Sequence, residues 1–352
     1  MAASPDGPTT LVSRPAVHAA AKLLGALCLL AVAAVGVALA LGTESTWWIE
    51  LARYLPFPVH LAPAVLALLL SLRQSWRWRA AALAALAVVL VPIMGLQLNR
   101  GEEGLAPLRV MSFNIKAYLA DDKPGGYGRI AWEIALHDAD LVALQDAGLA
   151  SSVETLPEPF KTALGTRQIH LSGQYLVASR FPMRDCRSGD ISFPGEGHHY
   201  VVCTISAHGV EFDFATAHLL SPREGLNATR HERLGGLDDW RENFAMRMIQ
   251  AHRLAQDVAA HPRPLVLAGD LNAPDSSPVI ERLREAGLRD SFAAAGVGYG
   301  YTYGHSLRPR FSFLRIDHVM VSAGIGVKDS TVGGAQASAH RPVIADLWLK
   351  RE

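Results

Sequence analysis

LVLAGDLNA, residues Leu265–Ala273, is the stretch from which the fold is best predicted. Its apolar first half is bounded by prolines and predicts a buried strand, and Asp270 and Asn272 follow at the tip of that strand. Because side chains alternate along a strand, these two point the same way, and Gly269 allows close backbone approach. A carboxylate beside a carboxamide suits a hard cation, an attacking water and a phosphate oxygen. A strand that runs into an Asx turn explains the same letters equally well.

Other predicted strands also end in polar side chains. LRVMSFNI ends near Asn114, DLVALQ is followed by Asp146, and VEFDFATAH ends in His218. Such strands can gather oxygen ligands at one edge of a sheet, and a histidine there can donate to a phosphate or act as a general acid. Each residue alone also fits a cap, a turn or an ordinary surface position.

The C-terminal third continues this pattern. RIDHVMV predicts a strand with Asp317 near its start, and His340 precedes a closing strand at Val343–Leu349. Residues 227–260 predict a helix that packs on a sheet. The tyrosines of VGYGYTYG, residues 297–304, line a pocket or simply pack in the core.

Composition separates the chain into a membrane part and a large folded domain. The chain has 352 residues, of which 50% are hydrophobic, and its mean hydropathy of +0.16 exceeds that of a purely soluble protein. The apolar excess lies in the first hundred residues. Thirty-three basic residues balance thirty-three acidic ones, so no global field indicates nucleic-acid binding.

Three charge-free stretches predict transmembrane spans at residues 23–43, 54–72 and 80–99, each near the length of about 20 residues that crosses a bilayer. Prolines interrupt the second, and a cleaved signal peptide is the alternative for the first. We therefore expect a membrane domain over residues 1–99, a linker over residues 100–107 and a second domain over residues 108–352.

The loops predict orientation. RQSWRWR, residues 73–79, carries three arginines and no acid, whereas the connection after the first span carries Glu44 and Glu50 against Arg53. By the positive-inside tendency the arginine loop is cytoplasmic, so three crossings place the second domain on the periplasmic or extracellular side of the cytoplasmic membrane. The bilayer is thus the expected partner of a multi-pass protein.

The sequence contains three cysteines, one in the expected membrane domain and two in the second domain. Cys28 lies in the first span. Cys186 and Cys203 lie on the two arms of a predicted hairpin, where they form either a disulfide in an oxidising compartment or two free thiols.

The ordered set SFNI, LVALQD, SRFP, TAHL, GDLNA, GYTYG to RIDHV, and SAHRPV resembles the endonuclease/exonuclease/phosphatase superfamily from Leu108 to Leu349. The resemblance implies an α/β fold, a four-layer α-β-β-α sandwich of two mixed sheets, here preceded by the helical membrane domain. It also implies a phosphoester-cleaving site that depends on Mg²⁺, with Mn²⁺ as the alternative cation.

The resemblance assigns catalytic roles. His218 contacts the scissile phosphate, and Asp270 and Asn272 position or activate the nucleophilic water. Asp317 orients His340, which stabilises charge on the phosphoryl oxygens.

It assigns the metal to Asn114, Asp146 and Asp270. Asp146 stands where the family has glutamate, and Ala339 stands where it has aspartate. A shortened acid and a missing acid predict weaker cation binding.

Two functions from different classes fit this sequence. The first is a membrane-tethered, metal-dependent phosphoester hydrolase that acts outside the cytoplasmic membrane as a monomer on a lipid head group, a nucleotide or a nucleic acid. The second is a catalytically impaired relative that serves as a binding or scaffold domain. Asp146 and Ala339 favour the second, and the first is favoured by the retained residues His218, Asp270, Asn272, Asp317 and His340.

Overall fold

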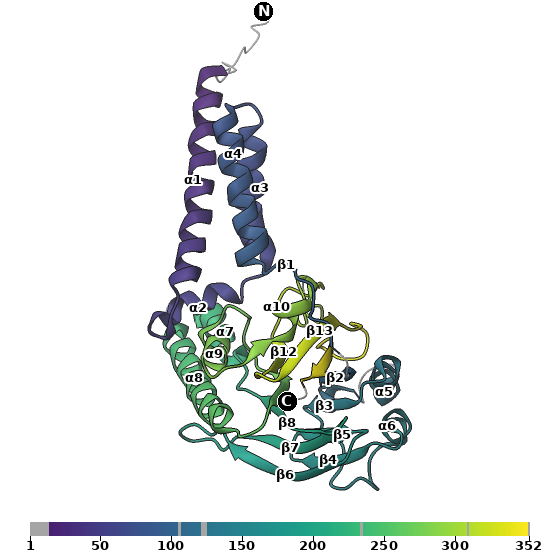
Figure 1. The fold of residues 1–352 in the computed structure, drawn as a ribbon. Helices are drawn as coiled ribbons and strands as arrows, with labels where there is room; N and C mark the ends of the chain where they lie inside the picture. The colour runs from purple at the N-terminus through teal and green to yellow at the C-terminus, as the bar shows by residue number, and fades with distance from the viewer. Residues whose placement is uncertain (1–13, 105–106, 121–124, 233–234, 308–309, 351–352) are drawn as a thin grey trace, which may run out of the picture. The chain divides into compact units, whose positions relative to one another are not determined.

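The computed structural model describes residues 14–104, 107–120, 125–232, 235–307 and 310–350 (Figure 1). The first thirteen residues of the expected membrane domain, and residues 105–106 of the expected linker, lie outside them. The chain divides into two compact units. The N-terminal unit lies within Met1–Leu41 and Pro56–Gly95, and the C-terminal unit comprises Gly42–Leu55 and Leu96–Glu352.

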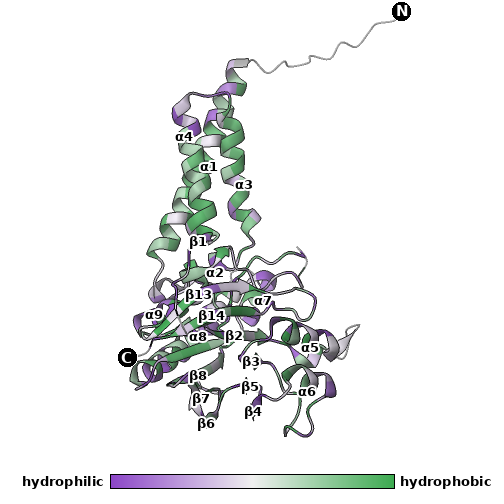
Figure 2. Ribbon diagram, turned by 45° about the vertical axis from the view of Figure 1, so that its right-hand side comes forward, coloured by the Kyte–Doolittle hydropathy of each residue, from purple (hydrophilic) through white to green (hydrophobic). Residues whose placement is uncertain are grey.

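The N-terminal unit is helical. It contains α1 (Arg14–Leu41), α3 (Phe57–Ser71), α4 (Trp76–Val88) and the π-helical turn η2 (Val89–Ile93). Figure 2 shows that α1 and α3 are hydrophobic along much of their length. Among the described residues, two helices are long and apolar enough to cross a membrane, Pro15–Leu41 and Trp76–Ile93, and a bent pair, Glu44–Arg53 with Phe57–Ser71, is a third candidate.

The ends of the expected spans differ from this arrangement. Tyr54, the first residue of the expected second span, is buried in the C-terminal unit. The last residues of the expected third span form β1 (Gln97–Leu98), which pairs with β11 (Val297–Gly298) of the C-terminal unit. Helical structure before them ends at Ile93, after a π-helical turn that contains Pro92.

Two six-stranded sheets form the centre of the described part of the C-terminal unit. The first has the order β10 (Arg289–Asp290), β12 (Asp317–Val321), β9 (Leu265–Asp270), β8 (Val210–His218), β7 (His199–Ala207) and β6 (Met183–Asp190). The second has the order β13 (Ile325–Val332), β14 (Val343–Leu349), β2 (Pro107–Asn114), β3 (Leu141–Gln145), β5 (Tyr175–Ser179) and β4 (Gln168–Ser172). Both are mixed, because β8–β9 and β2–β3 are parallel pairs among antiparallel ones.

Three apolar clusters define four layers. The cluster between the sheets takes alternate residues from both, such as Val110 and Cys203. A second cluster packs α8 (Gly236–Ala260) and α9 (Pro278–Glu285) on the outer face of the first sheet, and a third packs α5 (Gly126–His137) and α6 (Glu158–Leu164) on the second. The predicted four-layer α-β-β-α sandwich of two mixed sheets is therefore confirmed.

The remaining described elements are short or lie at the periphery. They are η1 (Glu44–Thr46), α2 (Trp47–Arg53), η3 (Ala117–Leu119), α7 (Arg223–Glu232) and α10 (Ser291–Ala295). Residues 227–260 form two helices rather than the single helix expected, because α7 ends at Glu232 and α8 starts at Gly236.

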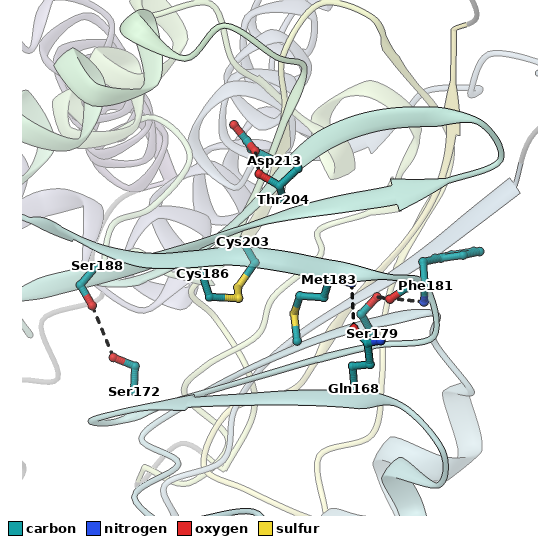
Figure 3. The surroundings of a disulfide bond; sticks show 10 residues. All are labelled: Gln168, Ser172, Ser179, Phe181, Met183, Cys186, Ser188, Cys203, Thr204 and Asp213. Atoms are coloured by element: carbon teal, nitrogen blue, oxygen red, sulfur yellow. Dashed lines mark hydrogen bonds between the residues drawn. A yellow bond between two sulfur atoms is a disulfide. The ribbon is translucent and has the colours of Figure 1, made fainter.

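The predicted hairpin places the two cysteines together. β6 and β7 pair antiparallel, and a bulge between Arg184 and Arg187 brings Cys186 opposite Cys203. The two residues form a disulfide that faces the space between the sheets (Figure 3).

Candidate active site

The strand ends gather the predicted site residues. Asp270 ends β9, and its parallel neighbour β8 places His218 beside it in register. Gly269 is required here, because a Cβ would lie 2.0 Å from the carbonyl oxygen of Ala217 on β8. On the other side of β9, antiparallel β12 places Asp317 directly opposite Asp270. Two carboxylates and an imidazole thus share one end of the first sheet.

Asp270 is the centre of the group. Its Oδ2 accepts a hydrogen bond from Asn114 Nδ2 at 2.9 Å, and it lies 3.6 Å from His218 Nε2 and 3.7 Å from His340 Nε2. Burial and the charge of Asp317 raise the pKa of Asp270, and the nearby histidines oppose that rise. This carboxylate therefore lies where an additional positive charge would stabilise its ionised form.

His340 is held in one orientation. Its Nδ1 lies 2.9 Å from Asp317 Oδ2, and because a carboxylate only accepts, Nδ1 carries the proton and Nε2 faces Asp270. Burial lowers the pKa of His340, but the two carboxylates outweigh burial and raise it. The ring of Tyr303 packs 4.7 Å from the imidazole. The arrangement is suited to a histidine that carries positive charge.

Asn272 adopts a left-handed backbone conformation with φ 50° just after β9. Its backbone N–H donates to Asp270 Oδ1 at 3.0 Å, and its Nδ2 donates to the carbonyl oxygen of Leu219 at 2.8 Å. The loop after β9 is thereby fixed to the carboxylate that precedes it.

The second sheet contributes Asn114 and Asp146. Asp146 follows β3 with φ 50°, and its Oδ1 lies 3.6 Å from His218 Nδ1. Its Oδ2 lies 3.1 Å from the ammonium of Lys116. Burial opposes ionisation of Asp146, yet His218 and Lys116 together lower its pKa.

The site fits a hard cation at its buried acids. Oxygens of Asp270 and Asp317 and a nitrogen of His340 all lie within 4.8 Å of one another. Two adjacent buried carboxylates repel each other, and a divalent cation would relieve that repulsion. Of the expected metal ligands, Asp270 belongs to this group, whereas Asn114 donates to Asp270 and Asp146 pairs with Lys116.

Several supporting residues were not predicted from the sequence. Gln174 Oε1 accepts from His218 Nδ1 at 2.6 Å, and the hydroxyl of Tyr175 accepts from the His218 backbone N–H at 3.0 Å. Lys116 directly follows the SFNI motif, which was the available signal for it. Tyr303 lies in the loop whose tyrosines were candidates to line a pocket.

Comparison with known proteins identifies one matching family and several solved structures of similar fold. The model of the Endonuclease/Exonuclease/phosphatase family matches residues 111–340. No curated protein matches the chain.

Three solved structures have similar folds. An endonuclease/exonuclease/phosphatase from Bacteroides vulgatus has a TM-score of 0.53 at 16% identity, over 70% of this chain and 100% of that one. An endonuclease/exonuclease/phosphatase family protein from Leptotrichia buccalis C-1013-b has a TM-score of 0.51 at 16% identity, over 68% and 99%. The mannosyl-6-phosphatase of Bacteroides thetaiotaomicron VPI-5482 has a TM-score of 0.50 at 19% identity, over 68% and 99%.

Proposed function

Since this chain belongs to the Endonuclease/Exonuclease/phosphatase family, we propose that its C-terminal unit hydrolyses phosphoester bonds with the help of a divalent cation. The observation that carries this proposal is the convergence of His218 and His340 on Asp270, at 3.6 and 3.7 Å from the same carboxylate oxygen. In this arrangement the buried acid can accept a proton, and the two imidazoles can donate hydrogen bonds to a phosphate.

Asp270 and His340 have different roles in the proposed reaction. Asp270, held by Asn114 and by the Asn272 N–H, accepts a proton from the water that attacks phosphorus. His340, whose Nδ1 is tied to Asp317, directs Nε2 toward negative charge that develops on the phosphoryl oxygens.

Gln174 holds the second imidazole. It fixes the ring of His218 so that Nε2 faces Asp270, and this nitrogen donates to the scissile phosphate when the ring is an imidazolium.

A divalent cation bound at the acids would neutralise phosphate charge and lower the pKa of the attacking water. Asp270 and Asp317 are the acids best placed to hold it, with Asp146 on the opposite side of His218. Oxygen ligands favour Mg²⁺, and Mn²⁺ is the alternative.

We also propose a place for the reaction. The apolar helices tether the chain to the cytoplasmic membrane in several passes, and the arginine loop at residues 73–79 orients the C-terminal unit to the periplasmic side. The disulfide between Cys186 and Cys203 supports an oxidising compartment. A periplasm-active reporter fused after Arg100 should be active and a cytoplasm-only reporter silent; the opposite pattern contradicts this orientation.

A catalytically impaired binding domain is the second candidate. Lys116 pairs with Asp146, and no carboxylate stands at Ala339, so the side of the site formed by the second sheet offers little charge to a metal. A phosphorylated ligand could then bind the two histidines without being cleaved.

One experiment separates the two. The full chain, in detergent or nanodiscs, is assayed with a phosphodiester, a phosphomonoester and phospholipids, with Mg²⁺, Mn²⁺ or a chelator. We expect hydrolysis that the chelator abolishes and that His340→Ala reduces at least a hundredfold. His170→Ala, on the edge strand β4, is the matched control and should keep full activity. Inactivity on every substrate, with phosphate ester binding retained, establishes the binding domain instead.

A further inference from the structure

The segment between α1 and α3 in sequence is folded as part of the C-terminal unit. It comprises residues 42–55, which include α2 (Trp47–Arg53) and Tyr54. The hydroxyl of Tyr54 donates to the carbonyl oxygen of Asn272 at 2.8 Å, across 218 residues of sequence. A residue that lies between two apolar helices in sequence therefore contacts the backbone of the loop that follows Asp270.

Tyr54 is held firmly in this contact. Arg247 on α8 donates from Nη1 to the Tyr54 hydroxyl at 2.6 Å, and its guanidinium lies 5.4 Å from the centre of the Tyr54 ring. Trp240 packs against the same ring in a T-shaped arrangement, with 5.6 Å between centroids. All three side chains are buried, so the hydrogen bonds are shielded from water.

A second contact from α2 holds the far end of the same loop. The carboxylate of Glu50 accepts a hydrogen bond from the Ser277 hydroxyl at 2.6 Å and lies 3.7 Å from Arg247. Ser277 in turn accepts the N–H of Val279 and so caps α9. The loop from Asn272 to Ser277 is thus held at both ends by one short helix and the residue after it.

The contact at Asn272 bears on the site, because three groups of this residue are constrained at once. Its N–H binds Asp270, its side chain binds Leu219 and its carbonyl oxygen binds Tyr54. The N–H and the carbonyl oxygen of Asn272 belong to the two successive peptide groups that meet at its left-handed Cα, so the bonds to Asp270 and Tyr54 hold this backbone conformation from both sides.

The next peptide of the loop is held from the opposite side. His318 Nε2 lies 2.9 Å from the carbonyl oxygen of Ala273, and its Nδ1 lies 2.7 Å from Asp290 Oδ2. This support comes from β12, within the sheet, whereas Tyr54 at Asn272 and Glu50 at Ser277 come from the segment between the apolar helices, and of these two Tyr54 contacts the residue that binds Asp270.

We propose that Tyr54 is a positioning residue for hydrolysis. It fixes the peptide after Asn272 and thereby the orientation of Asp270 toward the attacking water; this inference rests on the proposed function. Since Tyr54 is joined in sequence to α1 on one side and α3 on the other, catalysis depends on the segment that links these helices. A chain cut at the predicted linker would lack this contact.

The test uses the full chain with Tyr54→Phe, which keeps the ring on Trp240 and removes the hydrogen bonds that the hydroxyl makes with Asn272 and Arg247. Tyr200→Phe is the matched control, because Tyr200 is also buried and its hydroxyl binds Asp257 on α8 rather than the site. We expect kcat to fall about tenfold for Tyr54→Phe with KM unchanged, which corresponds to the one lost hydrogen bond that reaches Asn272, and the control to keep the wild-type value.

Hydrogen exchange provides a readout that does not need activity. Amides of residues 271–276 should exchange faster in Tyr54→Phe than in the wild type, while those of β8 and β9 stay protected. Equal kcat and equal exchange in the two proteins overturn the inference, as does faster exchange spread over the whole C-terminal unit. If the wild type hydrolyses nothing, the proposed function fails, and the exchange of residues 271–276 alone decides whether Tyr54 holds the loop.

Discussion

The ammonium of Lys116 lies 3.1 Å from Oδ2 of Asp146, and both side chains are largely withdrawn from solvent. Burial lowers the pKa of Lys116, but Asp146 and Asp270 outweigh burial and raise it, so the site contains a fixed positive charge. That charge attracts a phosphate and repels a metal ion. Lys116 therefore favours binding of a phosphorylated ligand and opposes binding of the cation that hydrolysis requires.

Replacement of Lys116 tests which effect dominates. Lys116→Met should strengthen Mn²⁺ binding by up to about tenfold, because a like charge a few ångströms from the ion is removed. Electron paramagnetic resonance titration of free Mn²⁺ measures this directly. Lys161→Met, whose ammonium pairs loosely with exposed Glu158 at 3.9 Å, is the control and should bind like the wild type. Unchanged or weaker binding in Lys116→Met would show that no cation binds near Asp146.

The two departures from the family pattern predict weak metal binding. Ala339→Asp should place an acid beside His340, and Asp146→Glu should extend the carboxylate by one methylene. Each should lower the Mg²⁺ concentration needed for half-maximal activity, by a few-fold, and the double variant more than either alone. His340→Ala should instead depress turnover even at saturating Mg²⁺, since it removes charge stabilisation. A double variant with unchanged metal requirement argues that the ion binds elsewhere.

The buried carboxylate of Asp290 supports the loop after β9 through His318, and we expect this support to be lost in acid. It is buried and accepts from Arg315 Nη1 at 2.8 Å and from His318 Nδ1 at 2.7 Å. Burial opposes ionisation of Asp290, but Arg315 and His318 hold its pKa far below the usual range. A depressed folded pKa gives stability that is complete above the unfolded pKa, about 4, and is lost as pH falls below it.

Asp290→Asn should therefore lower the free energy of unfolding by about 3 kcal/mol at pH 7, because the buried guanidinium of Arg315 loses its negative partner. Thermal unfolding followed at pH 7, 5 and 3 should show this deficit shrink as the wild type loses the same contribution. Asp238→Asn, in the exposed first turn of α8, should match the wild type at each pH. A deficit that stays constant over this range would rule out the ion pair as its cause.

The disulfide should contribute measurably to stability. Cys186 and Cys203 are 17 residues apart, and a loop of that size predicts about 3 kcal/mol for the cross-link. Reduction of the wild type should lower its unfolding temperature, whereas a Cys186→Ser, Cys203→Ser variant should be insensitive to reductant. Cys28→Ser, which keeps the pair, should respond like the wild type. Free thiols at both positions in protein isolated from native membranes would refute the bond.

The sequence predicted individual strands because that information is local, whereas the sandwich was implied by the resemblance of several ordered motifs to one family. Alternating apolar runs mark strands, and polar residues at their ends mark the edge where strands deliver side chains, so Asp270, His218 and Asp317 could be named before their contacts were known. The structure places these three on neighbouring strands, in register.

Partners from distant parts of the chain were decided only by the tertiary structure. Lys116 beside Asp146, Gln174 on His218 and Tyr303 against His340 depend on how strands stack and loops cross, which no local pattern specifies.

The clearest such case is the segment of residues 42–55, which folds as part of the C-terminal unit. Their composition, with two tryptophans near apolar spans, indicates a membrane interface, and Tyr54 read as the start of a span. In the fold, burial against Trp240 and Arg247 outweighs that local signal, because a tyrosine whose hydroxyl finds two partners is stable in a protein core. The sequence by itself determined which residues could form a phosphoester site; the tertiary structure decided which others hold them in place, since those contacts join segments that only folding brings together.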